Sequence, residues 1–404
     1  MPTSYATFRT FVGVAKDSIN ATLSSSIAAA ATSLPLQNTV GTTGTLTTSG
    51  ATYTAIIFDG FLTETVACSG NLTGGAIACA ATANAHSANV YIAFQLTASV
   101  GPTDYIPVES FQPIDMIAQL IDATSRGYAA KTFGVQPGMR HGTWDISGAV
   151  FPDTFGHILG AHLGADTVTG AGPYTHKFSA NNSGTYQPTH YILYDLNGYN
   201  TRVFAGTLCS ELTITFDPSK LVSYTSKWLA RASGVLPTPT QSFSAIVPVP
   251  SWMAVLSLNS AVVGNIKTFA VTSTREDSQV VDTITGNQDP YTIFAGEQEC
   301  KGKCTSIKQD DGILNYYAGA VPLTQPPISL VLTNGTGASQ TGLTVQLTKV
   351  AVSNVVTKHK GAPLVEEDFD ILGIANSTDG TPGGGQAPAQ FQLVNAVSSA
   401  GTYV

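Results

Sequence analysis

Residues 142–164, with the sequence GTWDISGAVFPDTFGHILGAHLG, predict a strand, a tight turn and a short helix. Residues 143–150 have the composition of a strand, and a Phe-Pro-Asp sequence then turns the chain. Phe155, Ile158 and Leu159 recur at the spacing of one helix face, so we expect them to pack on a sheet. A short amphipathic helix among many strand signals needs a sheet to cover. The stretch therefore predicts a mainly β fold.

Similar signals recur in the second half of the chain. Asp153, an acceptor for unpaired N–H groups at the expected helix start, is echoed by Asp311. Behind Asp311 we expect Ile313, Leu314 and Tyr317 to pack on a sheet as a second helix. The alternative to a duplicated fold is chance similarity between two β-rich halves. The other echoes, in order, are Thr124-Ser125-Arg126 with Ser273-Thr274-Arg275, Phe133 with Phe294, and Gly142 with Gly302.

The composition favours either a robust extracellular β protein or a subunit that works in an assembly. Charged residues make up 11% of the chain, against about 25% in a typical globular protein. Uncharged polar residues and glycine must therefore form most of the surface. Few charges leave a monomer with little protection against self-association.

The charge balance argues against affinity for nucleic acid or for anionic membranes. The net charge is −8, from 18 basic and 26 acidic residues, and no basic cluster is present. The first residues do not have the pattern of a signal peptide. The most apolar window, residues 245–258, contains two prolines and is too short to span a membrane. We therefore expect no membrane partner.

Five cysteines, an odd number, do not make a disulfide framework. Cys68 and Cys79 flank a Gly-rich turn and are placed to face each other across a hairpin. Cys300 and Cys304 lack the spacing of a zinc site. We interpret all five as free thiols, mostly buried, in a reducing cytoplasm.

Changes of composition divide the chain. Residues 17–103 are rich in Ala, Thr, Ser and Gly, and two strands around Asp59-Gly60 predict a type I′ hairpin there. Asn197-Gly198 predicts another hairpin, and residues 208–216 alternate as a half-buried strand with Glu211 on its polar face. The expected domains are a first tandem domain at 1–16 and 104–235, an inserted β module at 17–103, a Pro-rich linker at 236–250, a second tandem domain at 251–375 and a C-terminal arm at 376–404.

The sequence contains no recognisable catalytic or metal-binding pattern. His157 and His162 are five residues apart, so on one helix they point to different faces, and we interpret them, with His141, as surface or interface residues. Asp310-Asp311 and residues 366–368 are the densest acidic groups, and a helix start and a solvated loop explain them. We predict no enzyme activity, no metal and no cofactor.

Several strings, taken together, resemble the tail tube (major tail) proteins of long-tailed double-stranded DNA phages. The resemblance covers residues 1–16 and 104–320 and loosens after that; residues 17–103 depart from the pattern as an insertion. The strings are FVGVAKDS (11–18), IPVESFQPID (106–115), residues 134–166, YTHKF (174–178), residues 187–217, STRE (273–276) and DPYTIFAG (289–296).

This resemblance implies a virion structural protein, assembled in the host cytoplasm. Such subunits form rings that stack into a tube around the tape-measure protein and meet terminator and tip proteins at its ends. Double-stranded DNA later passes through without specific binding. The fold implied is two tandem tube-type β-sandwich or barrel domains, each with one short helix, plus the inserted all-β module on the exterior. With two such domains per chain, we expect a trimeric ring with pseudo-sixfold symmetry; the alternative is a hexamer.

Two sets of residues follow from this role. Glu211 is a candidate carboxylate of the tube lumen, where an acidic or neutral wall would not hold DNA; the alternative is that its face meets solvent outside the tube. Phe391, Leu393 and Val394 are candidates for an arm that binds the adjacent ring by strand addition. Two other classes stay open: a secreted or surface β-domain binding module, and a β-rich hydrolase.

Overall fold

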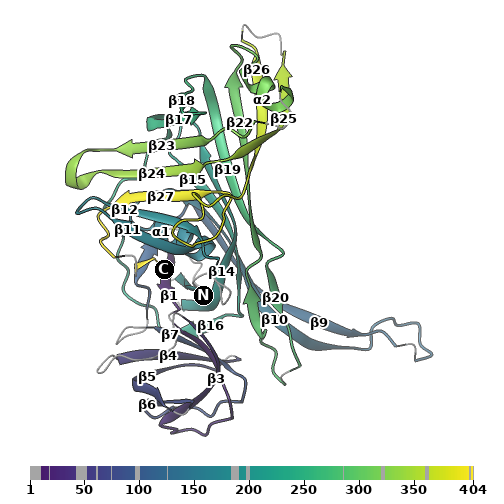
Figure 1. Cartoon of the computed structure of the whole chain (residues 1–404). Coiled ribbons are helices and arrows are strands. Elements are labelled where there is room, and N and C mark those ends of the chain that lie inside the picture. Colours follow the sequence, from purple (N-terminus) through teal and green to yellow (C-terminus); the bar gives the residue numbers. More distant parts are fainter. Residues whose placement is uncertain are drawn as a thin grey trace, which may run out of the picture.

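The computed structural model is mainly β, as the sequence predicts, and consists of two sheets packed face to face, a small barrel at one end and a long projecting hairpin (Figure 1). It describes residues 11–17, 19–41, 52–60, 62–73, 75–95, 101–124, 126–182, 191–196, 201–284, 286–319, 324–359, 364–399 and 402–403. The Asn197-Gly198 turn lies outside these residues.

The larger sheet runs through both halves of the chain. It therefore joins the two expected tandem domains instead of ending between them. Its main path is β9 (Ser110–Asp122), β10 (Gly134–Ala149), β15 (Ser223–Ala230), β14 (Thr201–Phe216), β19 (Ile266–Glu276), β22 (Glu297–Ile307), β26 (Glu366–Gly373) and β25 (Val350–Lys358). A branch from the first half of β14 adds β16 (Gly234–Leu236), β13 (Tyr191–Leu196), β1 (Phe11–Lys16) and β8 (Asp104–Ile106).

The second sheet is completed by the last strand of the chain, β27 (Gln390–Asn395). β27 pairs with β12 of the first half and β24 of the second. Phe391 and Leu393 are 1% and 0% exposed, and Val394 is half-buried. The predicted free arm is therefore wrong, because these residues form a central strand. The order is β11 (Gly164–Thr169), β12 (Tyr174–Ala180), β27, β24 (Thr341–Leu347), β23 (Ile328–Asn334), β17 (Ala254–Leu258) and β18 (Ala261–Val262).

One hydrophobic core lies between the two sheets and extends through both halves. It includes Trp144 and Trp228 of the first half and Phe369 and Ile371 of the second. Burial of this continuous apolar surface is the main force that holds the sheets together. Residues 237–249 form no strand, and the Phe243 ring lies 4.8 Å from that of Phe11.

Helix α1 (Phe155–Leu163) lies in this core and contacts β11, β12 and β14. It begins one residue later than the Asp153 signal indicates: Thr154 is the N-cap, and no side chain caps the first turn. It ends at Gly164, whose φ of 84° is the left-handed conformation that glycine adopts most easily. Neither α-helix of the described residues is long and apolar enough to span a membrane.

The C-terminal segment packs directly on α1. Tyr403 is fully buried, its backbone oxygen accepts a hydrogen bond from the Tyr191 hydroxyl, and its own hydroxyl donates to the backbone oxygen of Asp153. Gly156 and Gly160 make this approach possible. A Cβ atom on Gly160 would lie 2.2 Å from the Tyr403 backbone oxygen.

Gly160→Ala should therefore destabilise the protein, although alanine is ordinarily favoured over glycine inside a helix by up to about 1 kcal/mol. We expect a loss of about 1–3 kcal/mol from overpacking, measured by urea unfolding. The matched control carries Gly160→Ala in a chain without residues 403–404, where the clash is gone. An equal loss in both backgrounds would contradict this explanation.

The order of elements repeats between the halves. Strand β10 leads to α1, β11 and β12, and β22 leads to α2 (Gly312–Ala318), β23 and β24. The two arginines of the Ser-Thr-Arg echo differ in environment: Arg126 is exposed beyond the end of β9, whereas Arg275 is buried within β19. The remaining elements outside residues 17–103 are β20 (Gln279–Val281) and β21 (Thr292–Phe294), which pair, and the 3₁₀ helices η3 (Ser251–Met253) and η4 (Gly337–Ser339).

Within residues 17–103 the structure contains a closed barrel with its own core. The predicted turn is shifted by one residue: Asp59 pairs with Leu62, and Gly60 has φ of 62°. Cys68 lies opposite Cys79 in the strand register, and both are free thiols, as are the other three cysteines. The strand order is β2 (Ile19–Leu23), β3 (Ser33–Gly41), β6 (Ala76–Cys79), β5 (Leu62–Thr73), β4 (Thr52–Asp59) and β7 (Tyr91–Gln95).

A buried polar cluster fixes the barrel to the sandwich. The Tyr91 hydroxyl donates to the Asp17 carboxylate over 2.6 Å, and the Arg231 guanidinium lies 3.9 Å from the centre of the Tyr91 ring. Arg231 also donates to the backbone oxygens of Pro290 and Tyr291. Burial raises the pKa of Asp17 to about 8, and hydrogen bonds and Arg231 oppose this rise. The barrel and the sandwich therefore share a buried, hydrogen-bonded junction.

Candidate assembly surfaces

The outward side of the long sheet, here called the polar face, carries mostly Ser, Thr, Lys, Asp and Glu. Side chains alternate along each strand, so apolar residues enter the core and polar ones point away from it. Asp145, Lys227, Glu211, Thr274 and Glu299 are in register across five neighbouring strands. Other members of the polar face are Ser147, Thr213, Thr225, Thr272, Lys301, Lys303, Asp368 and Asp370.

A bulge in β14 sets which residues reach this face. The register shifts between Cys209 and Glu211, so Cys209 enters the core and Ser210 is only half-buried. The expected simple alternation over 208–216 is wrong at these two positions. It resumes with Leu212 inside and Glu211 and Thr213 on the polar face.

Three lysines of the polar face are paired with carboxylates of the same sheet. Lys227 Nζ lies 3.1 Å from the Glu211 carboxylate. Lys301 pairs with Glu299 in the same way, as Lys358, at the edge of the sheet, does with Asp368. Phosphate binding needs clustered basic groups with free positive charge. These three pairs give the face little attraction for a DNA backbone.

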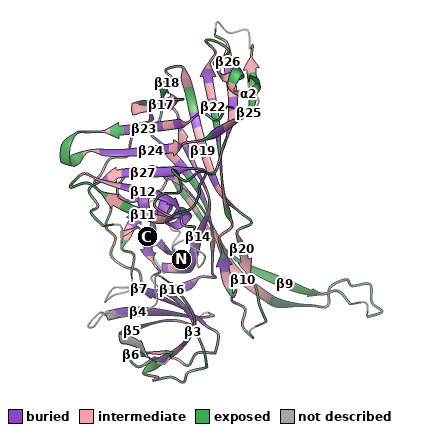
Figure 2. Cartoon of the chain, viewed as in Figure 1, coloured by how far each residue is buried: buried purple, intermediate pink, exposed green. Residues whose placement is uncertain are grey.

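Both edges of the main path are open in the chain. β9 pairs with β10 and β25 pairs with β26, and the described residues provide no further partner for either. Figure 2 shows that β9 is exposed along most of its length. An exposed apolar edge strand is a site for pairing with another chain. The exposed apolar side chains of β9 are Ile114, Met116, Ile117, Leu120 and Ile121.

The two helices differ in burial. All residues of α1 are buried, including Phe155, Ile158 and Leu159, which the sequence places against a sheet. In α2 no residue is buried. Its packing on the sheet comes from Ile313 and Tyr316, whereas Leu314 and Tyr317 are 39% and 43% exposed. The expectation that Leu314 and Tyr317 pack on a sheet is wrong for the single chain.

His157 and His162 are both buried, so the surface interpretation is wrong for them. His157 Nε2 lies 2.9 Å from an Asp104 carboxylate oxygen. His162 lies where the two halves meet, 2.8 Å from the Ser273 hydroxyl, and burial lowers its pKa to about 3. Arg275 donates to the backbone oxygens of His162 and the next residue, at the end of α1. His141 is half-buried.

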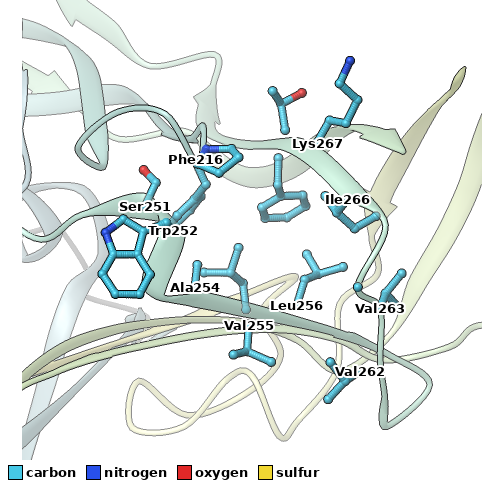
Figure 3. Close-up of a pocket in the computed structure, with 15 residues that line it drawn as sticks. Phe216, Ser251, Trp252, Ala254, Val255, Leu256, Val262, Val263, Ile266 and Lys267 are labelled. Carbon is cyan, nitrogen blue, oxygen red and sulfur yellow. The ribbon is translucent and has the colours of Figure 1, made fainter. Parts of the chain in front are cut away.

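An open groove of about 330 Å³ lies between the β17–β18 edge and β19 (Figure 3). Trp252, Val255 and Val262 line it, and Lys267 is its one charged side chain, paired with Glu366. Such a groove has no set of converging polar groups that would hold a substrate. Among the described residues, no three His, Cys, Asp or Glu side chains are grouped to hold a metal ion.

The comparison with known families decides what these surfaces belong to. The sequence model of the phage tail tube protein family matches residues 85–393, well over half of the chain. The chain belongs to this family. As a phage tail tube protein it is a structural component of the virion tail, in a family that assembles with itself and with other tail proteins. The match begins inside the barrel region and extends into β27, beyond residue 320, where the resemblance of the sequence strings loosens. No curated protein matches the chain.

Proposed function

We propose that this tail tube protein polymerises as stacked rings of three chains and forms the conduit for DNA ejection. The observation that carries the ring is the long sheet: it contains two successive four-strand units, β9-β10-β15-β14 and β19-β22-β26-β25, with an open edge at each end. Three chains joined edge to edge would give six such units. Ring closure removes open edges, which otherwise lead to aggregation.

In this arrangement the polar face lines the lumen, with Glu211 among its carboxylates. Lys227 and Lys301 pair with carboxylates of this face, so passing DNA would release few counterions and gain little affinity. The tape-measure protein would occupy the lumen before DNA, and terminator and tip proteins would close the two ends. The barrel, fixed by Asp17 and Arg231, would decorate the exterior of the tube. Assembly would take place in the host cytoplasm, and no catalytic step is involved.

Electron microscopy and native mass spectrometry of the purified protein test this proposal. We expect tubes or rings, with threefold symmetry in top views and a ring mass of three times 41.9 kDa. Six chains per ring would overturn the trimer. A monodisperse monomer at all concentrations and salt conditions would contradict the tube and favour a β-domain binding module.

A further inference from the structure

The contact between the two halves of one chain has a defined register. Strand β14 pairs with β19 from Glu211 opposite Thr274 to Phe216 opposite Phe269. Arg275, next along β19, donates to the last carbonyls of α1. The first half therefore presents a strand edge and a helix end, and the long hairpin of the second half covers both.

Irregularities of the sheet show which residues of the two halves correspond. Gly138 lies at the bulge of the β9–β10 hairpin, and Gly296 lies where the β19–β22 pairing gives way to the β20–β21 pairing; a Cβ on them would meet Ala118 and Glu276 respectively. The two glycines are 158 residues apart (296 − 138), and so are the two residues that they would meet (276 − 118). Asp153 and Asp311, at the helix starts, have the same separation. In the last two strands of each unit, the bulges at Ser210 and Ser353 are 143 residues apart (353 − 210).

By this correspondence, β25 is the counterpart of β14, α2 of α1, and β9 of β19. The counterpart surfaces are uncovered in the single chain. Leu159 of α1 is fully buried, whereas Tyr317, its counterpart, is 43% exposed. Helix α2 contacts β25 as α1 contacts β14, so the second half has the same pair of a helix and a strand. Among the described residues of the single chain, no hairpin covers this second pair.

We propose that the hairpin of a second copy of this chain covers β25 and α2, with β9 paired to β25 in the register that β19 has with β14. This proposal rests on the proposed ring and specifies its closing interface. The register follows when 143 is added to each β14 residue number and 158 is subtracted from each β19 residue number. It places Asn354 opposite Met116, Val355 opposite Asp115, Val356 opposite Ile114, Thr357 opposite Pro113 and Lys358 opposite Gln112.

The chemistry of this register is consistent. Val356 and Ile114 are 44% and 39% exposed in the single chain and become a directly opposed apolar pair. Both belong to the outward side of their strands, so the polar face continues across the joint. Ile117 takes the position of Arg275 and comes to the end of α2, as Arg275 comes to the end of α1. Pro113 has no N–H, so the proposed β9–β25 pairing has at most one backbone hydrogen bond fewer than the β14–β19 pairing.

Cysteine cross-linking tests the register. The variant Val356→Cys/Ile114→Cys places thiols on directly opposed residues, at a separation that a disulfide can bridge. Under mild oxidation of assembled protein we expect covalent dimers and closed trimers on non-reducing gels, at more than tenfold the yield of either single variant. The control, Val356→Cys/Ile117→Cys, places the second thiol on the other side of β9 and should not cross-link.

The outcomes separate this proposal from the proposed function. Tubes in the microscope without cross-links in the Val356→Cys/Ile114→Cys variant would overturn the register and leave the tube standing. Equal cross-linking in the control would also overturn it. Cross-linked species of up to six chains on the gel would overturn the closure of the ring by three chains. If the unsubstituted protein forms no rings under the same conditions, the proposed function itself fails.

Discussion

A chain that ends at Ala389 should fail to accumulate as folded soluble protein. It lacks β27, which pairs with β12 on one side and with β24 on the other. Its loss exposes two new strand edges and removes Phe391 and Leu393 from the core. Truncating buried Leu and Phe side chains costs about 2–5 and about 3–5 kcal/mol respectively, against a total stability of about 5–15 kcal/mol. Soluble yield and circular dichroism measure the effect.

Point variants provide the matched control. Leu393→Asp places a charge between the sheets and should reproduce the loss of folded protein. Gln392→Lys changes the adjacent half-buried residue, which faces away from the core, and should alter stability by less than about 1 kcal/mol. A folded, soluble chain ending at Ala389 with the full-length melting temperature would show that β27 is not part of the sandwich.

Arg231→Met should be the most damaging single change at the junction of the barrel and the sandwich. Methionine keeps much of the buried volume but removes the donors to Pro290 and Tyr291 and the cation over the Tyr91 ring. Breaking a buried charged cluster by removing one partner costs about 3–5 kcal/mol. Urea unfolding measures the loss. Lys220→Met, at a mostly exposed lysine, is the control and should cost almost nothing.

The cost of Arg231→Met should also grow with pH. The folded-state pKa of Asp17 is about 8, raised from 3.8, so its buried charge destabilises the folded protein increasingly as pH rises between these values. Arg231 stabilises the ionised form, so its removal raises the pKa of Asp17 further. The wild type and the variant should therefore differ more at about pH 9 than at about pH 6. In the double variant with Asp17→Asn this pH dependence should disappear, and its persistence would assign it to another group.

Local patterns predicted the parts of the fold whose signals lie close together in the sequence. Phe155, Ile158 and Leu159 mark α1 because helical spacing is visible within nine residues. The position of β27 has no such signal. Its partners lie more than two hundred residues away in β12 and about fifty away in β24, and the Gly- and Pro-rich stretch before it is typical of a free arm.

The same reason explains the other differences. The bulge at Ser210 depends on how three strands fit together, so an alternating pattern cannot reveal it. The sequence predicts α2 correctly as a helix, but Leu314 and Tyr317 face a surface that the single chain leaves open. Buried His162 is fixed by Ser273 and Arg275, which come from the other half of the chain. Glu211 was placed on the polar side of its strand, where the structure also has it.

The place of β27 has a consequence for the order of events during synthesis. The strand that joins β12 to β24 is synthesised after both of its partners. The second sheet therefore stays divided until β27 has left the ribosome. The open edges at β9 and β25 are carried on a finished sandwich only after that point. Tube growth would draw on chains that contain β27, and chains terminated before it would be left out.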